Sequence, residues 1–392
     1  MNIRALIPAV ALVIGASAAV TVDRAASSPL LPAPQPPSLT LIHMVTPHTG
    51  WGATRTDVVH TTDGGQRWQK VTPSIKLSGG SMPYTGLDPL NGASTWLAAP
   101  TARNQFGFTA ITVFHTTDSG VTWQRGQTIH VGLFVGIDHL QFADRTHGWL
   151  VVTRDVGMSQ QSFEIYRTAD GGAHWARILR EGPMYPSSSQ TGLLPWCDCM
   201  QQYNFVSPTA GWAGACSCAL TSGLVQLYRT DDGGRSWRSF PLILPRGYHP
   251  QATAIGAPVF FGSGIGILSV VLLNSSASGF FDEYHTVNGG RTWSGSTTIR
   301  VQLQDDPASF PDAMHAILQD GQTLYRTADG GHTWRTSHSS LARDSLMQLD
   351  LVTPTLGFAL EGVGATDKTH LLRTGDGGKT WKLVQASLVA RG

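Results

Sequence analysis

Short apolar runs alternate with polar turns along most of this chain. The segment 224–230 (LVQLYRT) is one such run, and the segment 205–215 (FVSPTAGWAGA) holds two runs separated by a turn. The runs are too short for helices, and the turns between them are rich in Gly, Pro, Ser and Asp. The pattern therefore predicts an all-β protein built of short strands.

One polar motif, called the box below, recurs seven times with the pattern Thr-x-Asp-x-Gly-x-x-Trp. The box tryptophans are 55, 52, 62, 56, 41 and 47 residues apart. The Thr, the second Gly and the Trp occur in every copy, which predicts a repeat architecture. The acidic position is occupied by Asp63, Asp118, Asp170, Asp232, Asn288, Asp329 and Asp376.

A weaker signature precedes most boxes. An apolar residue is followed seven positions later by an aromatic or aliphatic one, usually after Gly, as in Met44…Trp51 and Phe142…Trp149. The second repeat is expected to depart from this spacing, with extra residues before Trp96. Two strands flank this turn, a third leads into the box and a fourth starts at the box Trp, so each unit should contain four strands.

Four strands per unit at this period are the layout of a propeller blade. Seven units predict one domain over residues 39–386, a seven-bladed β-propeller of four-stranded antiparallel blades with Asp-box turns. Residues 387–392 are left as a C-terminal tail. The pattern does not determine which strands close the ring.

The chemistry of the box fits a tight turn. An Asp carboxylate can accept hydrogen bonds from backbone N–H groups of the turn, and the second Gly can adopt a positive φ. The Trp is expected to cover the base of the hairpin and to belong to the core. Calcium ligation or acid catalysis is the alternative role for the aspartates. Because a catalytic site is normally singular, seven near-identical copies favour the structural role.

These residues resemble the BNR/Asp-box repeat, which occurs in sialidases, sortilin-type receptors, some xyloglucanases and the photosystem II stability/assembly-factor-like family. A Gly-Trp turn followed by a Tyr-Arg-Thr-x-Asp-Gly-Gly box is most similar to the last of these. The resemblance covers about 350 residues and implies the propeller fold, but function is only weakly implied by fold. It does not imply photosynthesis.

An enzyme of the sialidase type would need features beyond the boxes. Such enzymes are known for an Arg-Ile-Pro signature, three substrate-binding arginines, a Tyr nucleophile with a Glu partner and an Asp acid/base. Arg-Ile-Pro is absent, and none of Glu164, Glu181, Glu283 and Glu361 has a recognisable context. A glycosidase needs two carboxyl groups facing one bond. Spacing cannot pair the aspartates outside boxes that we considered, Asp138, Asp198, Asp282, Asp305, Asp306 and Asp312.

Composition narrows the possible partners. Lys+Arg is 27 and Asp+Glu is 26, so the net charge of +1 argues against a nucleic-acid surface. The 14 His residues show no metal-binding spacing, and no cofactor is expected. A monomeric binding scaffold without catalysis, with a protein or cell-surface glycan as ligand, is the favoured interpretation. An exo-glycosidase of the sialidase type is the alternative.

The N-terminal residues 1–22 are typical of an export signal. Arg4 precedes an uncharged stretch whose most apolar part is short, and Ala16-Ser17-Ala18 suits cleavage by signal peptidase. An uncleaved membrane anchor is the alternative. Residues 23–38 are rich in proline and should form a linker. The protein is therefore expected outside the cytoplasm, secreted or at the cell surface.

Ligands of such propellers generally use the face opposite the box turns, because the loops there vary while the blades hold them rigid. The longest connections on that face are expected at about 181–199 and 241–255. Aromatic, Arg and His side chains on such loops suit recognition. The candidate ligand contacts are Tyr185, Trp196, Arg246, Tyr248 and His249.

All four cysteines fall in the fourth repeat, as Cys197-Asp198-Cys199 and Cys216-Ser217-Cys218. Export favours two disulfides, whereas four thiolates could instead bind zinc or copper(I). If Asn204 lies opposite Gly211 in an antiparallel pair, Cys199 faces Cys216 and Cys197 faces Cys218.

Overall fold

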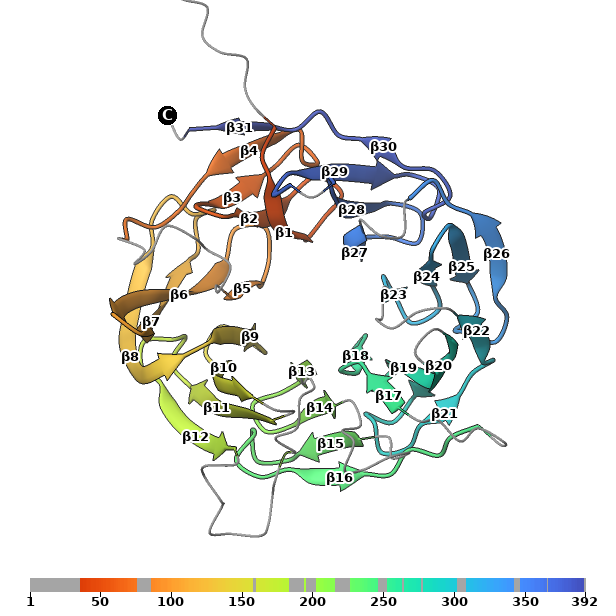
Figure 1. The fold of residues 1–392 in the computed structure, drawn as a ribbon, viewed down its shortest axis with the longest axis horizontal. Helices are drawn as coiled ribbons and strands as arrows, with labels where there is room; N and C mark the ends of the chain where they lie inside the picture. Colours follow the sequence, from red (N-terminus) through yellow and green to blue (C-terminus); the bar gives the residue numbers. More distant parts are fainter. Residues whose placement is uncertain are drawn as a thin grey trace, which may run out of the picture. The chain divides into compact units, whose positions relative to one another are not determined.

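The computed structural model describes residues 36–75, 86–157, 160–182, 194, 202–215, 226–245, 252–262, 264–275, 278–301, 308–341, 346–364 and 366–390. These residues form strands and turns and contain no helix. Seven antiparallel sheets follow one another around a central channel (Figure 1). The prediction of a seven-bladed β-propeller is confirmed.

Every blade consists of strands that are consecutive in the chain, with the first strand innermost. Blade 1 comprises β1 (Leu39–Met44), β2 (Gly50–Thr54), β3 (Val58–Thr61) and β4 (Arg67–Lys70). Blade 2 comprises β5 (Gly86–Pro89), β6 (Thr95–Asn104), β7 (Gly107–Thr116) and β8 (Gln124–Phe134). Blade 3 comprises β9 (Gly136–Phe142), β10 (Gly148–Gly157), β11 (Gln160–Thr168) and β12 (Ala176–Glu181). Blade 4 comprises β13 (Gln202–Phe205), β14 (Gly211–Ala215), β15 (Gln226–Thr230) and β16 (Arg238–Phe240).

Blade 5 differs from the four-stranded prediction, because its first and last strands are each split in two. It comprises β17 (Ala252–Ile255), β18 (Val259–Phe260), β19 (Gly266–Ser275), β20 (Ser278–Thr286), β21 (Ser294–Gly295) and β22 (Ile299–Val301). Blade 6 comprises β23 (Ala308–Ser309), β24 (Ala316–Asp320), β25 (Thr323–Thr327) and β26 (Arg335–His338). Blade 7 comprises β27 (Leu346–Leu351), β28 (Gly357–Gly362), β29 (Thr369–Thr374) and β30 (Lys382–Leu383).

The ring is closed by the C-terminal end of the chain. Residues that the sequence analysis assigned to a tail form β31 (Ser387–Val389), which pairs in parallel with β4 on the outer edge of blade 1. The Ser387 N–H donates to the Gln66 carbonyl at 2.9 Å. Figure 1 shows this strap running from the outer edge of blade 7 to the outer edge of blade 1.

The turn between the first two strands is uniform around the ring. Its first N–H donates to the carbonyl four residues later in six blades, from Val45 to Thr49 in blade 1 and from Leu90 to Ser94 in blade 2. The prediction of extra residues before Trp96 was wrong. Pro89 stands seven positions earlier, where the other repeats carry an apolar residue, and this hid the regular spacing.

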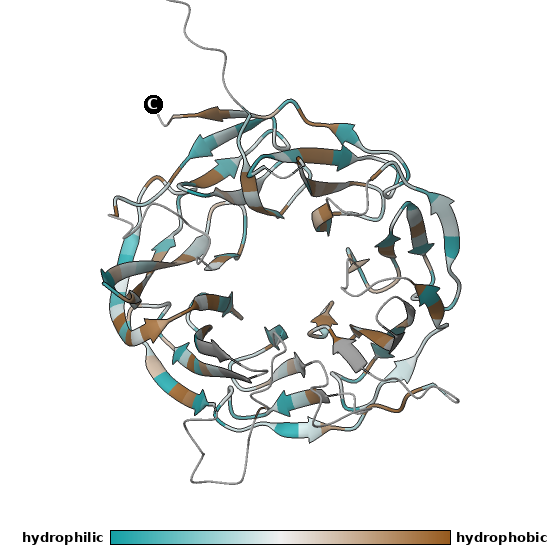
Figure 2. Cartoon of the chain, viewed as in Figure 1, coloured by the Kyte–Doolittle hydropathy of each residue, from teal (hydrophilic) through white to brown (hydrophobic). Residues whose placement is uncertain are grey.

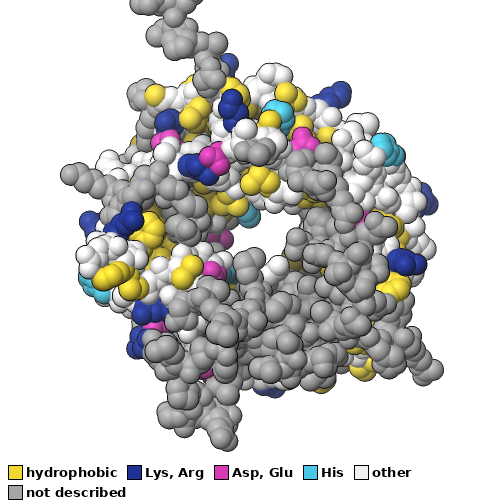
Figure 3. All heavy atoms as spheres, viewed as in Figure 1, with side chains coloured by type: hydrophobic (Ala, Val, Ile, Leu, Met, Phe, Trp, Pro, Cys, Tyr) yellow, Lys and Arg dark blue, Asp and Glu magenta, His cyan; other side chains and the backbone are white. Residues whose placement is uncertain are grey.

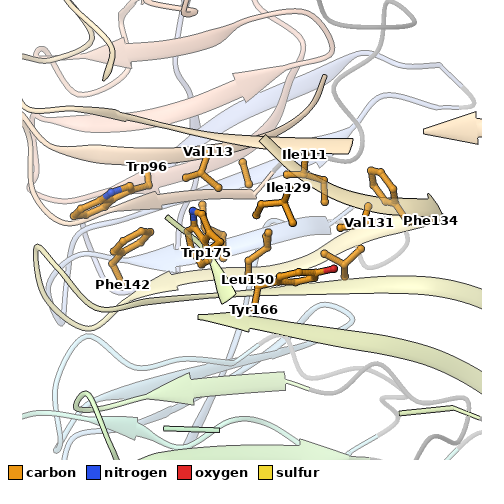
Figure 4. Close-up of a cluster of buried hydrophobic side chains, with 13 residues drawn as sticks. Trp96, Ile111, Val113, Ile129, Val131, Phe134, Phe142, Leu150, Tyr166 and Trp175 are labelled. Atoms are coloured by element: carbon orange, nitrogen blue, oxygen red, sulfur yellow. The ribbon is translucent and has the colours of Figure 1, made fainter. Parts of the chain in front are cut away.

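The core lies between neighbouring blades, in apolar bands along the strands (Figure 2). Between blades 2 and 3, buried side chains from both sheets interlock, among them Trp96, Ile111, Leu150 and Tyr166 (Figure 4). The Trp at the start of the second strand is the most deeply buried feature of the repeat. Trp51, Trp96, Trp149 and Trp212 are all at most 1% exposed.

The box tryptophans are less uniform than the sequence predicted. Trp68, Trp175 and Trp237 are buried, whereas the box tryptophans of the other four blades are half-buried. Half-buried box rings lie at the junction with the preceding blade, as Trp123 does against Trp51 and Trp293 against Trp212. The main aromatic anchor of a blade is therefore its second-strand residue.

Candidate functional site

The box carboxylates are bound within their own turns. In blade 4, Asp232 Oδ1 accepts from the Thr230 hydroxyl at 2.8 Å and from the Ser236 N–H at 2.9 Å, and Oδ2 accepts from the Ser236 hydroxyl at 2.5 Å. The second Gly, Gly234, has a φ of 93° and donates its N–H to the Thr230 hydroxyl. The equivalent contacts occur in all seven boxes, with Asn288 in place of the Asp in blade 5.

In the boxes of blades 2 and 6 these hydrogen bonds lower the pKa of the carboxyl group. Side-chain and backbone donation from Thr122 lowers the pKa of Asp118 to about 2, and Thr333 does the same for Asp329. A carboxylate whose oxygens accept from its own turn is a poor acid catalyst near neutral pH. The contacts are those that a structural role for the boxes requires.

The residue before each box Thr, at the end of the third strand, is Arg or His in all seven blades. In some blades it lies opposite a second basic residue on the fourth strand. In blade 4, Arg229 of β15 lies opposite Arg238 of β16. Asp231 accepts from both, with nitrogen–oxygen distances of 2.8 Å to Arg229 and 2.6 Å to Arg238. The like charges of this cross-strand pair are therefore neutralised.

Blades 6 and 7 carry the same cross-strand pairs without the bridging acid. Arg326 lies opposite Arg335, and Arg373 lies opposite Lys382. The position of Asp231 is occupied by Ala328 in blade 6 and by Gly375 in blade 7, leaving four cations. Among the residues that the structure describes, none of the ion pairs involves any of these four cations. Like charges directly opposite each other destabilise a sheet.

Two pockets open beside these cation pairs, on the face that carries the box turns. A pocket of about 670 Å³ lies between blades 7 and 1, lined by Arg373, Lys382 and the blade 1 turn residue His48, with residues 382–385 of the C-terminal strap along its outer side. A second pocket of about 370 Å³ lies between blades 6 and 7 and is lined by Arg326 and Arg335. Both pockets also contain box aspartates. Asp376 and Asp329 accept from their own turns through both oxygens, whereas the bonds of Asp63 are to Oδ1.

Sequence analysis missed this site because it treated the arginines before the boxes as part of the repeat. The available signal was the residue between Thr and Asp, which is acidic in blade 4 and small in blades 6 and 7. The consequence of that difference is visible only when the register of strands 3 and 4 is known, because the register pairs the two basic residues. The pockets beside the pairs arise where neighbouring blades meet, which the sequence does not show.

Side chains of the innermost strands link neighbouring blades along the channel. Asp350 Oδ2 accepts from the Met44 N–H at 3.1 Å between blades 7 and 1, and Asp88 Oδ2 accepts from the Phe142 N–H at 2.6 Å between blades 2 and 3. Burial raises the pKa of Asp88 to about 7 despite the hydrogen bond from Phe142, and burial also raises the pKa of Asp350. Side-chain amides also link neighbouring blades, since the Asn204 amide donates to the Pro258 carbonyl between blades 4 and 5.

The aspartates outside the boxes that the sequence analysis considered lie, where the structure describes them, in three different blades. Asp138 faces the channel from blade 3 and contacts the Thr153 hydroxyl, and the surrounding protein raises its pKa to about 6 although its side chain reaches solvent. Asp282 is fully buried in blade 5, and Asp312 caps a turn of blade 6 through His315. Asp198, Asp305 and Asp306 lie outside the described residues.

The ligand-face residues chosen from the sequence, Tyr185, Trp196, Arg246, Tyr248 and His249, also lie outside the described residues, as do the four cysteines. The register used to pair the cysteines was wrong, because Asn204 lies opposite Trp212 and Phe205 lies opposite Gly211. This shift by one residue removes the geometric argument for Cys199–Cys216 and Cys197–Cys218. Over the described ranges, no group of three or more His, Cys, Asp or Glu side chains is placed to hold a metal ion.

The comparisons with known proteins show the fold. No family model matches the chain. The xyloglucanase Xgh74A of Acetivibrio thermocellus is 22% identical over 261 residues, which is 60% of this chain and 28% of that protein. The chain thus spans just over a quarter of the length of the curated relatives it matches.

Solved structures with the same propeller include binding proteins and enzymes. The structure of YCF48 bound to D1 peptide has a TM-score of 0.54, with 16% identity over 88% of this chain and 93% of that chain. YCF48 from Cyanidioschyzon merolae has a TM-score of 0.54, with 18% identity over 88% of this chain and 97% of that chain. The GH74 xyloglucanase from Xanthomonas campestris has a TM-score of 0.55, with 17% identity over 89% of this chain and 54% of that chain. The resemblance expected from the boxes is confirmed.

Proposed function

We propose that this chain is an exported, non-catalytic β-propeller whose box face binds an anionic segment of a partner protein. The observation that carries the proposal is the pair of adjacent junction pockets, each lined by cross-strand cations without an acidic partner. A chain crossing blades 6, 7 and 1 would meet Arg326, Arg335, Arg373 and Lys382 in turn. The solved complex of a similar propeller with a peptide supports a protein ligand.

The chemistry of the pockets favours recognition over catalysis. Arginine and lysine make charge-assisted hydrogen bonds to carboxylates, which are shorter and stronger than neutral ones. Asp376 and Asp329 in these pockets already accept from their own turns through both oxygens, which makes them poor general acids. An extended acidic segment would neutralise both cation pairs and shield their mutual repulsion.

Fluorescence anisotropy with a labelled decapeptide of alternating Glu and Ala tests the proposal. The matched probe replaces every Glu with Gln, and an oligomer of sialic acid serves as the acidic glycan. The native protein should bind the Glu peptide in preference to the Gln peptide. The double variant Arg373→Gln/Lys382→Gln should bind the Glu peptide at least about tenfold more weakly, because hydrogen bonds to charged groups are lost.

The matched control is Arg229→Gln/Arg238→Gln in blade 4, where Asp231 neutralises the pair. This control should leave the peptide affinity unchanged. Equal binding of the Glu and Gln peptides, or equal losses in the two double variants, would overturn the proposal. Binding of the sialic acid oligomer alone would replace the protein ligand with a glycan. Turnover of a fluorogenic sialoside would instead establish the glycosidase.

A further inference from the structure

Blade 2 carries a hairpin unlike the short hairpin of its neighbour, blade 1. Strands β6 and β7 have ten residues each, whereas β2 and β3 of blade 1 have five and four. Five additional strand residues extend the hairpin by roughly 16 Å. Its tip, residues 104–107, lies on the face opposite the boxes, because the other end of β7 leads into the box at Thr116. We call this hairpin, with the adjoining residues 132–136, the tongue.

The tip of the tongue presents an apolar side chain where a turn normally carries a polar one. Phe106 is 74% exposed. The turn is well held, because Asn104 Oδ1 accepts from the N–H groups of Phe106 and Gly107. The corresponding turn of blade 1 is Arg55-Thr56-Asp57, which is polar throughout.

Two further apolar side chains extend this surface. Leu133 and Val135 are 44% and 47% exposed, and they point to the same side of the chain because alternate residues share a side in extended backbone. Phe134, between them, is buried against Phe108. A β-carbon on Gly107 would lie 3.7 Å from Leu133 Cδ2, so Leu133 lies against the tip.

The charges of the tongue are of one sign. Residues 101–108 and 130–136 contain Arg103 and His130 but no Asp or Glu. The Arg103 guanidinium lies 5.8 Å from the centre of the Phe108 ring, beside the apolar tip. Figure 3 shows hydrophobic side chains and Lys or Arg side chains on the rim of the molecule where β7 and β8 lie.

We propose that the tongue is a membrane-contact site that inserts Phe106 and Leu133 at the surface of a bilayer containing anionic lipid. An aromatic and aliphatic tip flanked by cations matches the interface between acyl chains and negative headgroups. The path of the chain gives independent support. Leu39 starts β1 at the end remote from the boxes, so the described chain enters the propeller on the face that carries the tongue. Among the described residues, no helix is long and apolar enough to cross a bilayer.

Site-specific photo-crosslinking of the full chain, purified after export, tests the proposal. p-Benzoylphenylalanine is placed at position 106, or at position 121 as the control. Val121 is 59% exposed in the same blade, but it lies in the box turn on the opposite face. The protein is irradiated on vesicles of phosphatidylcholine alone or with about one third phosphatidylglycerol, and lipid adducts are measured by mass spectrometry. This readout is specific to the position, so it does not depend on what the N-terminal segment binds.

The expected result is lipid adducts at position 106 and not at 121, with more adducts on vesicles containing phosphatidylglycerol. Phe106→Ser/Leu133→Ser should lower adducts at a probe placed at Val135 at least about tenfold, because apolar burial is lost. Arg103→Gln should lower the gain from phosphatidylglycerol about fivefold. Equal adduct yields at 106 and 121 would overturn the proposal. Adducts at 106 that consist only of protein, in irradiated cell membranes, would overturn it in favour of a partner or a second copy.

Discussion

Blades 4 and 7 have the same frame but present different charges. Both carry a box with identical hydrogen bonds, a buried aromatic residue at the second strand and a basic pair across strands 3 and 4. In blade 4 the residue after the box Thr is Asp231, which bridges both arginines. In blade 7 that residue is Gly375, and the pair Arg373 and Lys382 lines a pocket.

This difference separates the roles of the repeated and the variable positions. The positions that recur in every blade bind atoms of their own turn or of the next blade, and they hold the ring together. The positions that differ decide which charges face solvent. The proposed binding of an acidic segment therefore involves blade 7 and its neighbours, although blade 4 also carries a cross-strand basic pair.

The largest expected loss of stability comes from truncating the buried aromatic residue that blades 4 and 7 share. Trp212→Ala in blade 4 and Phe358→Ala in blade 7 should each lower the free energy of unfolding by about 3–5 kcal/mol, because both rings are at most 1% exposed and pack against the next blade. Chemical denaturation measures both variants. A cost below 1 kcal/mol in either blade would show that the two frames are not equivalent.

Substitution of the box aspartates should cause the second largest loss of stability. Asp232→Ala and Asp376→Ala should each lower the free energy of unfolding by about 1–2 kcal/mol, because turn hydrogen bonds are lost but little packing is. Both carboxyls have a lowered pKa in the folded state, so their contribution is present above their unfolded pKa and lost as the pH falls. The two variants should therefore approach the native protein in stability as the pH falls below the unfolded pKa of an aspartate, about 3.9. Loss of peptide binding at an unchanged melting temperature would contradict the structural role.

Blades 4 and 7 also differ in the innermost side chain that links each to the next blade. Blade 7 has the titratable Asp350, whereas blade 4 has Asn204, so only the blade 7 link should depend on pH. Burial raises the pKa of Asp350, so the folded state favours its protonated form. Its contribution to stability is present at low pH and is lost as the pH rises through the folded pKa. Asp350→Asn retains an acceptor for the Met44 N–H without titrating. Melting temperatures of the native protein relative to this variant should rise as the pH falls toward the unfolded pKa of an aspartate, about 3.9, and parallel profiles would refute the assignment.

The smallest stability effect concerns the bridging acid itself. Asp231→Gly should lower the free energy of unfolding by at most about 1 kcal/mol, because the ion pairs of Asp231 are exposed and screened by solvent. The loss should shrink further in high salt. Thermal denaturation in low and high salt measures both effects, and a salt-independent loss would point to packing in place of charge.

The fold was predictable from the sequence because the box repeats seven times with the residues that its turn needs. Two details of the fold were predicted wrongly from the sequence. Pro89 hid the regular spacing of the second repeat, and the register between β13 and β14 differs by one residue from the one used to pair the cysteines. The proposed binding site was not predictable, because Arg373 resembles its counterparts in sequence and differs only in what lies across the strand and across the junction to blade 1.

Installing the acid of blade 4 in blade 7 tests the central claim most directly. Gly375 has no neighbouring atom within 4 Å of an added β-carbon, so Gly375→Asp can be accommodated. The new carboxylate should bridge Arg373 and Lys382 as Asp231 bridges its pair. The measurement is the affinity for the labelled Glu–Ala decapeptide by anisotropy, with Asp231→Gly as the reciprocal variant. We predict that Gly375→Asp weakens binding at least about tenfold without lowering the melting temperature. An unchanged affinity in a folded Gly375→Asp protein would contradict the claim.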